Sequence, residues 1–128
     1  ESGAAYVFIR TGIEWVQQAK LSATDGAAND RFGTRVAIYG STAVIGAILG
    51  DATSNNSGSA YVFTRSGSTW SQQVKLTASD GAADDVFGWS VALHGDTVMI
   101  GAPTSIVALP GGTGSAYVFD ISHNEEID

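Results

Sequence analysis

The chain is poor in several residue types that specify chemistry. Its 128 residues include no cysteine, two prolines, and six basic side chains against thirteen acidic ones. Without cysteine, neither a disulfide framework nor a thiolate zinc site can form. The formal net charge of −7 would repel a nucleic-acid backbone. No apolar run approaches the roughly 18–20 residues that span a bilayer. We therefore expect no nucleic-acid partner and no membrane span.

Patterns typical of catalysis are also scarce. The two histidines, His94 and His123, fall in a predicted hairpin turn and in the acidic tail. Neither has a partnered nucleophile, and the sequence holds no glycine-rich phosphate loop and no His-based metal motif. Because no catalytic constellation is visible, we expect a protein that is not an enzyme.

What the chain contains instead is repeated text. The phrase Gly-Ser-Ala-Tyr-Val-Phe occurs at residues 58–63 and 114–119, and the near copy Gly-Ala-Ala-Tyr-Val-Phe occupies residues 3–8. Trp15 matches Trp70 at an offset of 55 residues. The sixteen glycines suit tight turns, and the Val, Ile, Thr, Tyr and Phe content favours strands. Repeats of this length in an all-β chain predict a propeller, a solenoid or an array.

One copy consists of four short strand-like runs divided by turn signals, and it predicts a four-stranded antiparallel meander. Tyr39-Gly40-Ser41-Thr42 is a hairpin signal, with His94-Gly95-Asp96-Thr97 as its counterpart. The run from Ala60 to Thr64 is apolar on both alternating faces, so both must be covered. In the outer strand, alternation predicts one face that carries Trp70, Val74 and Leu76. Sheets covered on both sides and repeated in tandem are what a β-propeller needs.

The pairs Phe32-Gly33 with Gly46-Ala47 and Phe87-Gly88 with Gly101-Ala102-Pro103 resemble the FG-GAP repeat family, found in integrin α-subunit propellers and in bacterial extracellular proteins. The resemblance implies an all-β chain of β-propeller blades, each a four-stranded antiparallel meander, with about two and a quarter blades here. The expected divisions are residues 1–24 (the last two strands of a blade), 25–79 (a complete blade), 80–121 (three strands of a further blade) and 122–128 (an acidic tail).

The acidic turns at residues 25–30 and 80–85 admit two interpretations. Their carboxylates and turn carbonyls could hold Ca²⁺, which takes oxygen ligands. Alternatively, Asp-Gly forms the turn and the later Asp hydrogen-bonds local amides. Integrin-like members often carry a calcium loop just before the Gly-Ala-Pro strand, but only a short turn stands there in this chain, so that site is not carried over. The candidate calcium ligands are Asp25, Asp30, Asp80, Asp84 and Asp85.

Candidate ligand contacts lie where the repeats differ. Trp89, compared with Arg35 of the preceding copy, is not required by every blade, so both are candidates, with surface variation as the alternative. The polar loop from Gly50 to Ser57 differs from its partner loop, and Asp51 and Asn55 could bind a glycan or an ion there. Polar loops that are merely solvated are the alternative.

The resemblance implies a secreted or cell-surface protein that acts as a non-catalytic binding or adhesion module, with glycan binding as its sharper form. The alternative is a structural repeat unit that self-assembles into a closed propeller without a ligand of its own. Nine expected strands cannot close a ring of four or more blades. We therefore expect partners in further propeller repeats of the same protein or in other copies of the chain.

Overall fold

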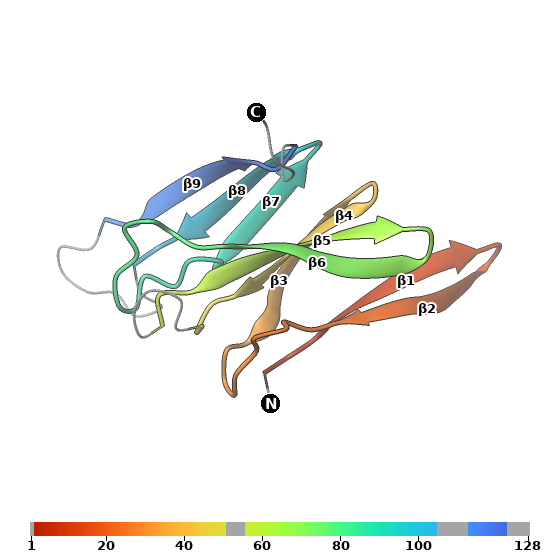
Figure 1. Ribbon diagram of the computed structural model, residues 1–128, viewed down its shortest axis with the longest axis horizontal. Helices are drawn as coiled ribbons and strands as arrows, with labels where there is room; N and C mark the ends of the chain where they lie inside the picture. The colour runs from red at the N-terminus through yellow and green to blue at the C-terminus, as the bar shows by residue number, and fades with distance from the viewer. Residues whose placement is uncertain (1, 51–55, 105–112, 123–128) are drawn as a thin grey trace.

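The computed structural model describes residues 2–50, 56–104 and 113–122. These residues form nine strands, which make three antiparallel sheets with the orders β1-β2, β3-β4-β5-β6 and β7-β8-β9. Figure 1 shows the four-stranded sheet between the two smaller ones. The bounds are β1 Ala5–Thr11, β2 Glu14–Leu21, β3 Phe32–Tyr39, β4 Thr42–Ala47, β5 Ser59–Ser66, β6 Thr69–Leu76, β7 Ser90–His94, β8 Thr97–Ala102 and β9 Ser115–Asp120.

Each sheet is a meander in which consecutive strands pair, so the predicted all-β blade architecture is confirmed. The two predicted hairpins are present, with Tyr39 opposite Thr42 and His94 opposite Thr97. None of the residues that the structure describes belongs to a helix long and apolar enough to cross a membrane.

The core lies between the sheets and is divided in two by β5. Ala60 and Val62 belong to a cluster that includes Val98 and Ile100 of the third sheet. Tyr61 and Phe63, on the other face of β5, pack with Phe32 and with Leu21 of the first sheet. The predicted burial of both faces of this strand is therefore confirmed, and the sheets stack as successive blades.

The Phe-Gly and Gly-Ala pairs of the repeat meet where adjacent blades approach most closely. Gly88 has a φ of +100°, and a Cβ atom built there would lie 2.5 Å from the carbonyl oxygen of Ser59. A Cβ atom on Gly46 would lie 2.5 Å from the carbonyl oxygen of Gly88. These distances leave no room for a side chain, and the positive φ also favours glycine. Backbone packs on backbone at this point of the blade interface.

The outer strand β6 corrects one sequence prediction. Its register against β5 shifts between Val62 and Phe63, whose partners are Val74 and Gln72, so the strand carries a β-bulge. The extra residue reverses the alternation of side chains beyond it. Trp70 therefore packs on the cluster towards the first sheet, and Val74 and Leu76 join the cluster towards the third. The prediction that all three share one face was wrong.

Candidate functional site

The largest apolar opening is a groove of about 640 Å³ between β1 and the β3–β4 hairpin, which we call the blade groove. Its lining includes Tyr6 and Phe8 from β1, Val36 and Ile38 from β3, and Ile45 from β4. Among the described residues, β1 pairs only with β2, so its other edge is an unpaired strand edge along the groove. Such an edge is a template for adding another strand.

Comparison with the complete sheet explains why the blade groove is open. Tyr6 and Phe8 are 53% and 51% exposed, whereas Tyr61 and Phe63, at the equivalent positions of β5, are 2% and 4% exposed. Tyr61 and Phe63 pack against Phe32, with ring centroids 5.4 and 6.1 Å apart.

The third sheet repeats this aromatic arrangement. Tyr117 and Phe119 pack in the same way on Phe87, with centroids 5.4 and 6.0 Å apart. Within the described part of the chain, no phenylalanine from a first strand stands beside Tyr6 and Phe8. The groove therefore has the place and the lining that a β3–β4-type hairpin would fill.

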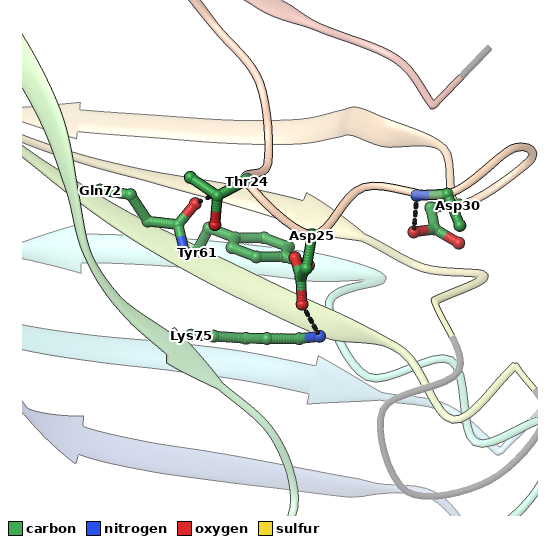
Figure 2. A network of polar contacts seen from close by, with 7 residues as sticks. Thr24, Asp25, Asp30, Tyr61, Gln72 and Lys75 are labelled. Carbon is green, nitrogen blue, oxygen red and sulfur yellow. Dashed lines mark hydrogen bonds and ion pairs between the residues drawn. The ribbon is translucent and has the colours of Figure 1, made fainter.

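A polar cluster ties the turn before each blade to that blade's outer strands. Asp25, in the turn between β2 and β3, accepts a hydrogen bond from the Tyr61 hydroxyl at 2.8 Å and an ion pair from Lys75 Nζ at 2.7 Å (Figure 2). Lys75 Nζ also lies 5.5 Å from the centre of the Tyr61 ring. We call these three side chains the turn latch. Beside it, the amide of Thr24 donates to Oε1 of Gln72 at 3.2 Å.

The turn latch shifts the protonation of its members in opposite directions. The hydrogen bond from Lys75 holds the pKa of Asp25 below its ordinary value, and the Tyr61 bond adds to this. Burial, followed by the adjacent Asp25 carboxylate, raises the pKa of Tyr61. The arrangement thus favours a charged Asp25 and a neutral Tyr61, which keeps both hydrogen bonds intact at neutral pH.

The other two sheets each hold part of a turn latch. In the third sheet, the Tyr117 hydroxyl donates to Oδ1 of Asp80 at 2.7 Å, and this bond raises the pKa of Tyr117. In the first sheet, Lys20 Nζ lies 5.9 Å from the centre of the Tyr6 ring, much as Lys75 lies over Tyr61. Spacing within a turn could not reveal this cluster. The signal that could have is the shared repeat offset of the Asp, Tyr and Lys positions.

A family model described as the FG-GAP repeat matches residues 15–63 and 70–119, more than half of the chain. The chain belongs to the FG-GAP repeat family. The expected recognition is confirmed, and the family indicates a propeller-type binding or structural module. A search of curated proteins finds no match to the sequence.

The acidic turns of the FG-GAP repeats form local hydrogen bonds. Asp30 accepts from the amide of Ala27, and Asp85 accepts from the amide of Ala82, both at 2.9 Å. Oδ1 of Asp84 accepts from the Asn56 side chain at 3.2 Å. Together with Asp25 and Asp80, these are all the candidate calcium ligands. The described residues contain no group of three or more His, Cys, Asp or Glu side chains that could hold a metal ion. This geometry favours the structural interpretation of the turns.

Trp89 and Arg35, the candidate ligand contacts at variable positions of the FG-GAP repeat, meet each other. The Arg35 guanidinium lies 4.9 Å from the centre of the Trp89 ring, a cation–π contact between the second and third sheets. The offset of 55 residues places Thr34, rather than Arg35, opposite Trp89, so the comparison of these two as equivalents was off by one residue. Asp51 and Asn55 lie outside the described residues.

Proposed function

We propose that the chain is a non-catalytic segment of a β-propeller, and that its blade groove binds the first two strands of a further blade. One observation carries this proposal. Tyr6 and Phe8 are half exposed at positions where the same residue types are buried in the complete sheet. The repeat itself therefore supplies the template for what covers them.

The groove is large enough for its closure to matter. Fully burying one large apolar side chain stabilises a protein by about 1.5–3 kcal/mol. Val36 and Ile38, like Tyr6 and Phe8, are a little more than half exposed. Covering the four would therefore contribute about 1 kcal/mol each, a substantial share of the roughly 5–15 kcal/mol that stabilises a folded domain.

Exposed aromatic residues, which could serve as sugar platforms in a binding or adhesion module, have structural counterparts here. Trp15 is 65% exposed. Its equivalent Trp70 packs in the core and donates from Nε1 to Oε1 of Gln18 at 2.7 Å. The ring of Trp89 is in contact with Arg35. These contacts support a structural role. Glycan binding and a secreted or cell-surface location remain predictions from the family resemblance.

The proposal is tested by completing the blade. Adding a copy of residues 25–56 ahead of Ser2 supplies the two strands that would fill the groove. The matched control is the same extension with the copied Val44 replaced by Asp, because Val44 faces the next blade in the described sheet. We expect the first extension to raise the urea midpoint of unfolding above that of the control. Equal midpoints would show that the groove does not take blade strands.

A glycan array separates the adhesion interpretation. A glycan signal that survives blade completion and is lost on substitution of Asp51 or Trp89 would favour a lectin over a purely structural segment. Secretion is tested by locating the protein in its native host.

A further inference from the structure

We propose that the occupant of the blade groove is the β7–β8 hairpin of a second copy of this chain, joined head to tail through Asp80 of one copy and Lys20 and Tyr6 of the other. This inference rests on the proposed function and names the partner. Two independent features carry it: the complementary parts of the turn latch at the two ends of the chain, and the aromatic residues at the same two ends.

The parts of the turn latch complement one another in charge. Lys20 is exposed over the Tyr6 ring, and among the described residues no carboxylate pairs with it. Asp80 is exposed and bound to Tyr117, and the described part of the chain places no lysine on it. Asp80, Tyr6 and Lys20 stand in the repeat where Asp25, Tyr61 and Lys75 form the complete latch. Two copies together therefore contain every member of a second complete latch.

The aromatic residues complement one another in the same way. With β7–β8 of one copy seated in the groove of the next, Phe87 would face Tyr6 and Phe8 as Phe32 faces Tyr61 and Phe63. The edge of β8 would pair with the unpaired edge of β1, as β4 pairs with β5 along its whole length. The same docking thus covers the groove and satisfies the strand edge.

Docking requires β9 to leave β8, because β1 takes its place. The two strands have near-identical text, Ala-Ala-Tyr-Val-Phe and Ser-Ala-Tyr-Val-Phe. β9 is loosely held, with Val118 63% exposed. Exchange of one strand for an equivalent one is a low-cost route to oligomers. It adds β2 as the fourth strand of the blade, which β9 cannot supply.

Each copy would then contribute two complete blades to a ring. Propellers usually have about four to eight blades, so two to four copies would close one. Closure by rotation removes every uncovered blade face, including the groove. A closed ring of copies is therefore the geometry in which both end sheets are covered.

The test is the mass of the chain in solution over a range of concentrations, combined with charge reversal. We expect the unaltered chain to assemble, and D80K or K20D alone to assemble about fivefold less tightly or worse, because like charges replace an exposed ion pair. An equimolar mixture of D80K and K20D restores opposite charges at every junction of an alternating ring, so it should recover the assembly of the unaltered chain. The matched control is D96K, a reversal in the exposed β7–β8 turn, which should leave the mass unchanged.

Several results would overturn the proposal. They are a monomer at all concentrations, D80K assembling as D96K does, or a mixture no better than its components. K20D changes an exposed residue at a sheet edge, so it keeps the test decisive if D80K fails to fold. A monomeric chain whose completed first blade is nonetheless stabilised would reject the second copy and leave the proposed function standing. Assembly without any stabilisation by the added hairpin would reject the proposed function.

Discussion

The backbone contact at Gly88 allows a quantitative test of what the glycine of the Phe-Gly pair does. In Gly88→Ala, the new Cβ would lie 2.5 Å from the carbonyl oxygen of Ser59, whereas carbon–oxygen contacts normally lie at about 3.3–3.6 Å. Relieving an overlap of about 0.8 Å or more requires a backbone shift of the kind that costs about 1–3 kcal/mol. The φ of +100° adds about 1–3 kcal/mol for a residue with a side chain. We expect a total loss of about 4 kcal/mol.

Gly95→Ala separates the two contributions. Gly95 also has a positive φ, +57°, but a Cβ there would meet nothing within 4 Å. That variant should lose only the backbone part, about 1–2 kcal/mol. The measurement is urea unfolding at one fixed low protein concentration, because association would otherwise stabilise the folded state. If the two variants lose the same free energy of unfolding, the close approach of blades at Gly88 does not constrain the fold.

Further predictions concern single contacts. Ser59→Ala should leave the free energy of unfolding unchanged or raise it by up to about 1 kcal/mol, because the buried Ser59 Oγ has no hydrogen-bond partner. The stabilisation from Asp25 is present above its unfolded pKa and is lost as pH falls through its lowered folded pKa. The difference in stability between the unaltered chain and Lys75→Met, at most about 1 kcal/mol at pH 6, should therefore shrink towards pH 2 in acid unfolding experiments. A double-mutant cycle with Arg35→Met and Trp89→Leu should give a coupling energy of about 0.5–1 kcal/mol, and zero coupling would contradict the cation–π contact. Millimolar Ca²⁺ should leave the melting temperature unchanged, because the carboxylates of both acidic turns bind protein donors; a rise would support a calcium site.

The repeat made the fold predictable from sequence. A 55-residue period with four strand-like runs leaves little choice of topology, and the two apolar faces around Tyr61 required a stack of sheets. The faces of the outer strand were not predictable in the same way. Alternation places Trp70 and Val74 on one side, and a single extra residue, which leaves no mark in composition, puts them on opposite sides.

The candidate site was predicted less completely. The acidic turns were identified as important positions, yet their partners come from strands that lie 36 and 50 residues further along the chain for Asp25. Local spacing carries no information about such partners. Trp89 and Arg35 were singled out because their positions vary, but variation alone does not distinguish a ligand contact from a contact between blades.

The bulge in β6 also bears on how the molecule comes apart. Because the strand sends Trp70 into one inter-blade core and Leu76 into the other, its detachment would open both cores at once. Unfolding of one blade is thereby coupled to the loss of packing on each side of it. The three sheets should accordingly melt in a single cooperative transition, and repeats of this kind would be gained or lost in evolution only in units that preserve the outer strand's contacts with both neighbours.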